Sequence, residues 1–364
     1  MTGRKDWLES FLKPDSEGAE RRTSERRSVD QLAAYRWNGH SLKRESVRDI
    51  SSTGLYLLTE ERWQPGTLVL LTLQKEGPLA MNAENRIDVQ VKVMRCGQDG
   101  VGLMFVLPDD QDSRQWESVR ENLIERAKPE DMLSFVRMAE AVVFLSRICP
   151  KGAERIGALV NGRLSSHKLA NAVSIALKAE NLLAFEPVTD KLRADPGLVV
   201  RILEDGSCTE EDWLKHFWGG LLANAVDGKR ESNLAFVDFL SQLTTFQVRI
   251  LTVVCTKATK VVSESGSIFA KPLRCKIEEL MLTTGSRGLQ FERDLERLSE
   301  LGLIEKREVG SPSSASGETD LTPSSLGLQF FAHCHGHRGS PQDFYAADSS
   351  AASNPGGPAI RKIS

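Results

Sequence analysis

Two short motifs in the N-terminal third of the chain combine residues that could hold a charged ligand. The first is Arg22-x-x-x-Arg26, and the second is Asp49-x-Ser51-x-x-Gly54. A guanidinium is a planar fork that can make two hydrogen bonds to the O6/N7 edge of guanine, and it also pairs with phosphate. Asp49 and Ser51 could bond to base edges or loop amides, while Gly54 would allow a turn with positive φ and close approach of a ligand. This combination suits a small, anionic ligand that contains guanine.

The charge around these motifs differs from that of the chain as a whole. The 364 residues have a net charge of −3, which speaks against a protein that wraps a nucleic-acid polymer. Between Glu20 and Arg48, however, eight Lys/Arg stand against four Asp/Glu, a local excess of four positive charges (8 − 4). A ligand with two phosphates needs no more than such a cluster. The alternative is a solvated basic stretch in which Asp49 and Glu45 pair with the arginines.

Other features of the sequence narrow the class of protein. The N-terminus lacks the apolar segment of a secretory signal, and the apolar runs are too short to span a membrane. Six scattered cysteines without a C-x-x-C pair are typical of reduced thiols, so we expect a cytoplasmic protein. Common hydrolase and metalloprotease motifs are missing, and His333-Cys334-His335-x-His337 has no second ligand cluster. We therefore expect no enzyme activity and no metal or redox cofactor.

The hydrophobic periodicity changes near residue 110. Before this point, short alternating runs separated by turn residues predict antiparallel strands of a barrel or sandwich. After Pro108 the apolar spacing becomes helical, beginning with a helix that places Trp116, Val119, Leu123 and Ile124 on one face. The predicted strands are 31–37, 41–49, 54–59, 67–74, 87–94 and 101–106. The predicted helices that follow are about 131–148, 152–185, 209–226, 231–262 and 275–302, with a break in the fourth near Thr244.

The C-terminal third predicts a winged-helix-like unit. A helical stripe ends at Gly302, and a short strand at 303–309, a loop and a second strand from Thr319 follow it. The candidate recognition helix contains more carboxylates than arginines, and carboxylates repel phosphates, so we expect no DNA binding. Residues 336–364 are rich in Ser, Gly, Ala and Pro, which predicts a disordered tail.

The two N-terminal motifs resemble those of the PilZ domains, which are bacterial receptors for cyclic di-GMP. That family has R-x-x-x-R followed about 20 residues later by [D/N]-x-S-x-x-G, within a six-stranded β-barrel, and this chain has both motifs in that order. The resemblance covers about residues 18–127. It implies that cyclic di-GMP is bound by Arg22, Arg26, Asp49, Ser51 and Gly54.

The same resemblance implies further properties of the site. In the family, the arginine loop becomes ordered on binding and repositions neighbouring domains. Arg21 lies directly before the first motif, and an arginine there goes with two stacked ligand molecules per site. Arg27 is a substitute for Arg26 if the register of the motif shifts by one.

A second resemblance covers about residues 150–335. The aromatic helix that contains Trp213, Phe217 and Trp218, the following F-V-x-F-L pattern and the winged-helix-like end are similar to the Abi-alpha family. Some members of that family act in abortive phage infection. The similarity includes no catalytic motif, so it implies no functional residues here.

Together these observations predict a multidomain β + α protein. A six-stranded antiparallel PilZ-like β-barrel precedes an all-α domain that ends in a winged-helix-like unit. The expected parts are an N-terminal segment with a short helix (1–17), the barrel with its C-terminal helix (18–127), a connecting helix (128–150), the helical domain (151–335) and the tail (336–364). We expect a cyclic di-GMP effector that acts on a protein partner through its helical domain. The alternatives are a phage-defence or scaffold protein with a purely structural barrel, and a winged-helix transcription regulator.

Overall fold

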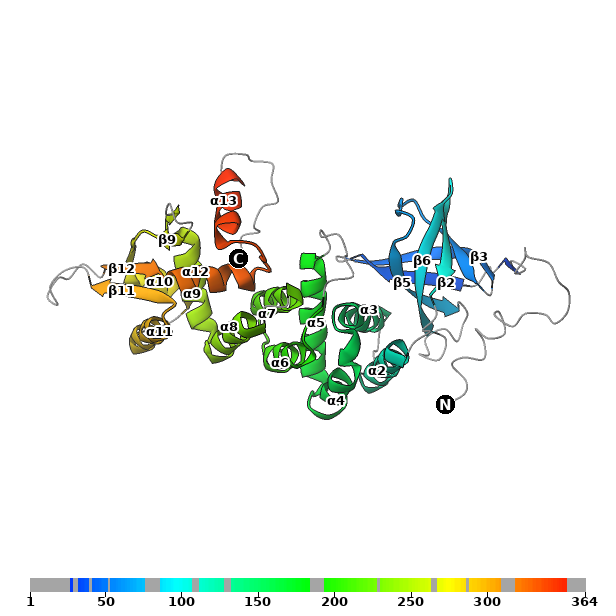
Figure 1. Ribbon diagram of the computed structural model, residues 1–364, viewed down its shortest axis with the longest axis horizontal. Coiled ribbons are helices and arrows are strands. Elements are labelled where there is room, and N and C mark those ends of the chain that lie inside the picture. The colour runs from blue at the N-terminus through cyan, green and yellow to red at the C-terminus, as the bar shows by residue number, and fades with distance from the viewer. Residues whose placement is uncertain are drawn as a thin grey trace. The chain divides into compact units, whose positions relative to one another are not determined.

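The chain folds as two compact units, Met1–Leu169 and Ala170–Ser364 (Figure 1). The computed structural model describes residues 27–28, 32–38, 41–51, 53–75, 86–106, 111–127, 132–183, 193–227, 230–262, 267–285, 288–308 and 318–351. The predicted N-terminal segment 1–17 lies outside the described residues.

The first unit contains a closed six-stranded antiparallel barrel, which confirms the predicted architecture. Its strands follow the order β3-β2-β5-β6-β7-β4, and β4 pairs back with β3 to close the barrel. A two-residue strand, β1 (Arg27–Ser28), pairs with the end of β3. All six predicted strands are present, as β2 (Leu32–Trp37), β3 (Leu42–Ser51), β4 (Gly54–Leu58), β5 (Leu68–Lys75), β6 (Arg86–Cys96) and β7 (Gly100–Phe105).

The alternation of inward and outward side chains breaks once in β3. Val47 and Ile50 both belong to the barrel core, although residues three apart in a regular strand point to opposite faces. The pairing with β4 passes from Val47↔Leu57 to Asp49↔Tyr56, so Arg48 is the extra residue of a β-bulge. The bulge turns both Arg48 and Asp49 away from the core.

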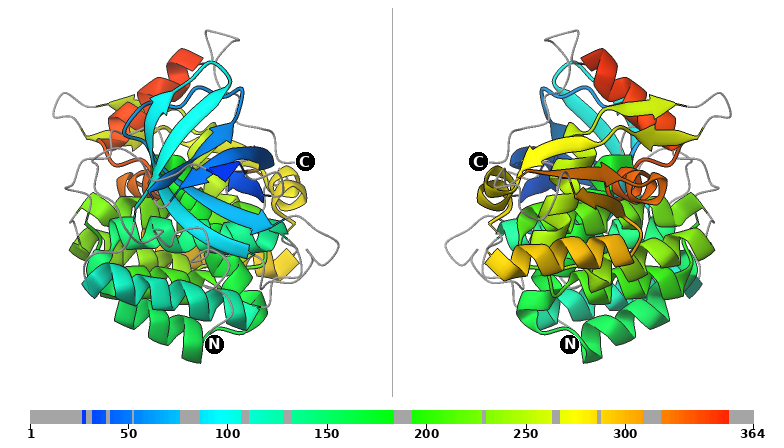
Figure 2. Two further views of the ribbon diagram at one scale, coloured as in Figure 1. Left: turned by 90° about the vertical axis from the view of Figure 1, so that its right-hand side faces the viewer. Right: turned by 90° about the vertical axis from the view of Figure 1, so that its left-hand side faces the viewer.

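Helix α3 (Met132–Ile148) covers the side of the barrel that β2 and β5 form. There the guanidinium of Arg137 lies 5.8 Å from the Trp37 ring centroid. Helix α2 (Gln111–Ala127) packs against α3 and α4 (Ala153–Gly162) through Trp116, Val119 and Leu123, which are buried as predicted. The left-hand view of Figure 2 looks toward the barrel.

The second unit begins with a bundle of helices. Helix α5 (Ser166–Leu183) starts at the end of the first unit, and α6 (Pro196–Gly206), α7 (Asp212–Asn224), α8 (Arg230–Gln242) and α9 (Thr245–Lys257) follow it. A capping box starts α9, because Thr244 Oγ1 accepts from Gln247 N at 3.2 Å and Gln247 Oε1 accepts from Thr244 N at 3.0 Å. This cap explains the predicted break between α8 and α9. The helix predicted at 152–185 is instead two helices, α4 and α5, and α6 was not predicted.

The winged-helix-like end is confirmed. Its elements are β10 (Leu273–Lys276), α10 (Ile277–Thr284), α11 (Gly288–Glu300), β11 (Ile304–Glu308) and β12 (Glu318–Pro323). The three strands form a sheet in the order β10-β12-β11. The right-hand view of Figure 2 looks toward this part. The unit nevertheless contains more β-structure than the all-α description predicts. The hairpin of β8 (Lys260–Val262) and β9 (Ile268–Ala270), together with β10, was missed because strands of three or four residues are too short for a periodic pattern.

The prediction of a disordered tail from residue 336 is wrong for its first part. Helix α12 (Ser325–Cys334) is followed by a further helix, α13 (Pro341–Ala351). Tyr345 of α13 is buried, and its hydroxyl donates to the Leu328 carbonyl oxygen at 3.1 Å. Phe344 also packs against Phe331 and His335, so aromatic side chains attach a segment whose composition is otherwise typical of disorder.

The close approach of β4 and β7 depends on Gly54. A Cβ at this position would lie 2.0 Å from the carbonyl oxygen of Leu103. We predict that Gly54→Ala destabilises the barrel by about 1–3 kcal/mol, because a backbone atom must move to make room. Gly162→Ala, at the end of α4, is the matched control, since its Cβ would meet nothing within 4 Å. Calorimetric unfolding should show a lowered barrel transition for Gly54→Ala alone, and equal transitions for both variants would contradict the close approach.

Candidate functional site

The second motif forms the hairpin between β3 and β4. Ser51 ends β3, Gly54 begins β4, and the two residues pair in register. The buried Ser51 hydroxyl donates to the Gly54 carbonyl oxygen at 3.1 Å and lies 3.4 Å from the Thr53 amide nitrogen. Ser51 therefore stabilises the turn that follows Asp49. The expectation of a positive φ at Gly54 is wrong, because this glycine is needed for strand contact and not for a left-handed turn.

The segment that follows the first motif runs beside the second motif. In β1, Arg27 pairs with Ile50 and Ser28 pairs with Asp49. The backbone after the arginine motif thus lies along the strand that presents Asp49. Arg21, Arg22 and Arg26 lie outside the described residues, and the structure describes the backbone of Arg27 but not its side chain.

Four residues form a row across the outer face of the barrel. Asp49 of β3 pairs with Tyr56 of β4, Tyr56 with Gly102 of β7, and Gly102 with Arg95 of β6. A second register shift, between Val93 and Arg95, precedes Arg95 in β6. The aliphatic part of Arg95 lies over Gly102, where a Cβ would be 3.0 Å from Arg95 Cγ. The row runs from the motif carboxylate to an exposed arginine that lies outside both sequence motifs.

Arg48 and Tyr56 form the centre of this face. The Arg48 guanidinium carbon lies 3.6 Å from the centroid of the Tyr56 ring, and Arg95 approaches the same ring at 5.9 Å. Arg48 Nε donates to Asp49 Oδ2 at 3.0 Å, and its Nη1 donates to Asp99 Oδ2 at 3.2 Å. The guanidinium is thereby held over the ring by a carboxylate on each side.

Tyr56 is fixed by its hydroxyl as well as by its ring. The hydroxyl donates to Asp99 Oδ1 at 2.8 Å, and Asp99 lies in the turn between β6 and β7. This hydrogen bond raises the pKa of Tyr56 and lowers the pKa of Asp99. The hydrogen bond to Asp49 likewise raises the pKa of Arg48, so the guanidinium stays positively charged.

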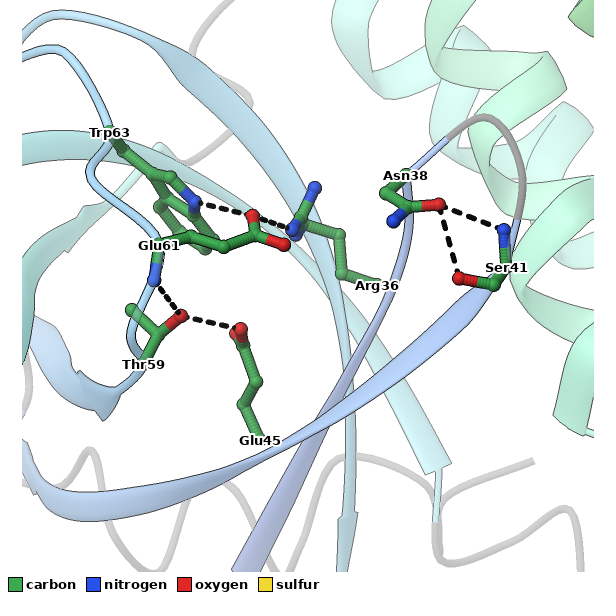
Figure 3. A network of polar contacts seen from close by, with 7 residues as sticks. All are labelled: Arg36, Asn38, Ser41, Glu45, Thr59, Glu61 and Trp63. Atoms are coloured by element: carbon green, nitrogen blue, oxygen red, sulfur yellow. Dashed lines mark hydrogen bonds and ion pairs between the residues drawn. The ribbon is translucent and has the colours of Figure 1, made fainter.

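A second polar network lies beside the β2–β3 hairpin, as Figure 3 shows. Arg36 forms an ion pair with Glu61, and Trp63 Nε1 donates to the same carboxylate at 3.2 Å. Glu45 accepts from Thr59 Oγ1 at 2.6 Å, and burial raises its pKa. Asp49 forms an ion pair with Arg48, which belongs to the basic stretch. The signal that could have revealed Arg48 is the three-residue spacing of Val47 and Ile50.

Histidines near the end of α12 form hydrogen bonds with backbone carbonyl groups. His333 Nδ1 lies 3.0 Å from the Gln329 carbonyl oxygen, and His335 Nδ1 lies 2.9 Å from that of Phe331. Among the residues that the structure describes, no group of three or more His, Cys, Asp or Glu could hold a metal ion. None of the described helices is both long and apolar enough to cross a membrane.

The candidate recognition helix α11 presents an acidic surface. Its exposed charged residues are Glu292, Arg293, Glu296 and Glu300, while Asp294 is buried and accepts from Gln247 and Gln290. Arg297 donates to Gln242 Oε1 at 2.9 Å and to Glu300 Oε2 at 3.3 Å. Two very exposed leucines flank the turn into this helix, Leu282 at 85% and Leu289 at 75%. The exposed carboxylates of α11 are unsuited to contact with phosphates.

Two protein-family models match the chain, one in each part. The PilZ domain family model matches residues 20–120, which contain the barrel and both motifs. The barrel is similar to PilZ domains. The model for abortive infection alpha matches residues 169–334, from α5 to the end of α12. Both resemblances in the sequence are thereby confirmed. The comparison with curated proteins finds no match.

The Tyr56–Asp99 hydrogen bond makes a testable prediction about the PilZ barrel. We expect Tyr56 to titrate above its usual pKa of about 10, and Asp99→Asn to lower this pKa because a neutral amide accepts a weaker bond. Since the folded-state pKa is raised, the stability from this bond is present below about pH 10 and is lost as pH rises through the folded-state value.

Absorbance at 295 nm measures tyrosine ionisation, and Tyr56→Phe identifies the contribution of Tyr56 among the three tyrosines. If Asp99→Asn leaves the titration of Tyr56 unchanged, the hydrogen bond does not set its pKa.

Proposed function

We propose that this protein is a cyclic di-GMP receptor whose binding site is the outer face of β3 and β4. At the level of the family, the PilZ match implies a cyclic di-GMP-binding effector, which is a ligand-binding and not a catalytic role. The observation that carries the assignment to this face is the pairing of β1 with β3. It brings the chain that follows Arg26 alongside Asp49 and Ile50.

The chemistry of the motif residues supports this site. Cyclic di-GMP has two phosphates and two guanines, so it needs cationic groups for the phosphates and both donors and acceptors for the bases. Arg22 and Arg26 provide two guanidiniums that suit phosphate or the O6/N7 edge. Asp49 provides acceptors for the N–H groups of guanine, and Ser51 and Gly54 hold the turn beside it. Arg21 and Arg27 are further cationic candidates, and Arg21 leads us to propose two stacked molecules per site.

The signal would pass through the segment that contains the arginines. A ligand held by Arg22, Arg26 and Asp49 joins this segment to the outer face of the barrel. We propose that this change alters the surface that the helical part offers to a protein partner. The shift can be no larger than the difference in affinity of the ligand for the two states.

Calorimetric titration of the full chain with cyclic di-GMP tests the receptor function. We expect the wild type to bind, and the Arg22→Ala/Arg26→Ala double variant to lose most of its affinity because two charge-assisted contacts disappear. Asp49→Ala should also weaken binding. The stoichiometry distinguishes one ligand molecule per chain from two.

The matched control is Lys151→Ala/Arg155→Ala, which removes two exposed positive charges at the same spacing near the start of α4. We expect this variant to bind as the wild type does. No heat from the wild type would refute the receptor, whereas full affinity in the double arginine variant would refute only the site. A phage-defence or scaffold protein with a structural barrel, with which the abortive infection alpha match is compatible, predicts the first of these results.

We further propose that the helical part acts on a protein and not on DNA. The acidic exposed face of α11 and the exposed Leu282 and Leu289 support this choice. Retention of the full chain on immobilised duplex DNA should therefore disappear near physiological salt, with or without cyclic di-GMP. Retention that persists at that salt concentration and requires α11 would instead favour the transcription regulator.

A further inference from the structure

Arg48 and Tyr56 form a flat, preassembled surface next to the motif carboxylate. The guanidinium carbon of Arg48 lies 3.6 Å from the ring centroid of Tyr56, a distance at which a guanidinium and an aromatic ring are in contact. Tyr56 is only 3% exposed, whereas the Arg48 side chain is 41% exposed. The guanidinium therefore covers the ring and is itself accessible to solvent.

Four contacts hold this arrangement in place without a ligand. Asp49 and Asp99 each accept a hydrogen bond from a different nitrogen of Arg48, at 3.0 and 3.2 Å. The hydroxyl of Tyr56 donates to Asp99 at 2.8 Å, which fixes the ring. Arg95 approaches the same ring at 5.9 Å from β6. A planar cation whose position is fixed in advance costs little additional entropy when a ligand stacks on it.

We propose that the Arg48 guanidinium, supported by the Tyr56 ring, is a stacking platform for a guanine base of cyclic di-GMP. This inference rests on the proposed receptor function and adds to it a binding residue outside both motifs. Nucleic-acid bases stack on arginine guanidinium planes as they do on aromatic rings. The base would lie over the exposed side of Arg48, beside Asp49, and the ring would lie on the opposite side of the guanidinium.

Two alternative roles for Arg48 make different predictions. If Arg48 only contributes positive charge, or only stabilises Asp49 through an ion pair, lysine should replace it, because lysine keeps the charge and reaches a carboxylate. If Arg48 is a stacking surface, lysine should fail, because an ammonium group has no plane. The platform also needs the ring of Tyr56 more than its hydroxyl.

Calorimetric titration with cyclic di-GMP distinguishes these roles in four variants of the full chain. Because base stacking on such surfaces is worth about 1–3 kcal/mol, we expect Arg48→Ala to weaken binding by about 5- to 150-fold. Arg48→Lys should be similarly weak, and Tyr56→Phe should stay within about threefold of the wild type, since it keeps the ring. Arg155→Ala, which removes an exposed guanidinium from α4, is the matched control and should bind normally.

The results also separate this inference from the receptor function itself. If the wild type binds and Arg48→Lys binds within about twofold of it, the platform is refuted and the receptor stands. If the wild type does not bind, both are refuted. The unfolding midpoint is measured for every variant, and Arg48→Lys provides the decisive comparison even if Arg48→Ala fails to fold.

Discussion

The candidate site depends on one extra residue in β3. A regular strand would place Asp49 on the same face as Val47, which belongs to the core, and a carboxylate there would be buried in an apolar interior at high cost. The bulge at Arg48 inserts one residue, so that Arg48 and Asp49 both turn outward and Ile50 returns to the core. Bulges are known for re-aiming side chains in this way. The same bulge therefore keeps the apolar side chains of β3 in the core and exposes its polar motif.

The rest of the face is built around the residues that this bulge exposes. Tyr56 pairs with Asp49 and receives Arg48 on its ring, and Asp99 joins the two through its carboxylate. A second bulge in β6 brings Arg95 to the far end of the row, where the missing side chain of Gly102 leaves space for its stem. The neighbouring β2–β5 side of the barrel is instead packed against α3. The barrel therefore has one face for structural contact and one that presents charged groups in a fixed arrangement.

Much of this fold could be predicted from the sequence because short apolar-polar runs between turn residues mark the strands, and a change to helical spacing marks the helices. All six strands of the barrel, its C-terminal helix and the winged-helix-like order were predictable on that basis. The polar face was only partly predictable. Asp49, Ser51 and Gly54 belong to a local motif, whereas Arg48, Tyr56 and Asp99 meet through a strand register that joins residues up to 51 positions apart. The strands β8 to β10 and helix α13 were missed for a different reason, because strands of three or four residues and one short helix of mostly small and polar residues leave almost no periodic signal.

The central claim is that the outer face of β3 and β4 binds cyclic di-GMP. Amide chemical shifts of the full chain, recorded by transverse-relaxation-optimised NMR during titration with the nucleotide, test it most directly. We expect the largest shifts at Asp49 and Tyr56 and at their row neighbours Gly102 and Arg95, and small shifts in β5 and along α3. Saturable shifts confined to β5 and α3 would place the ligand on the other side of the barrel and contradict the claim.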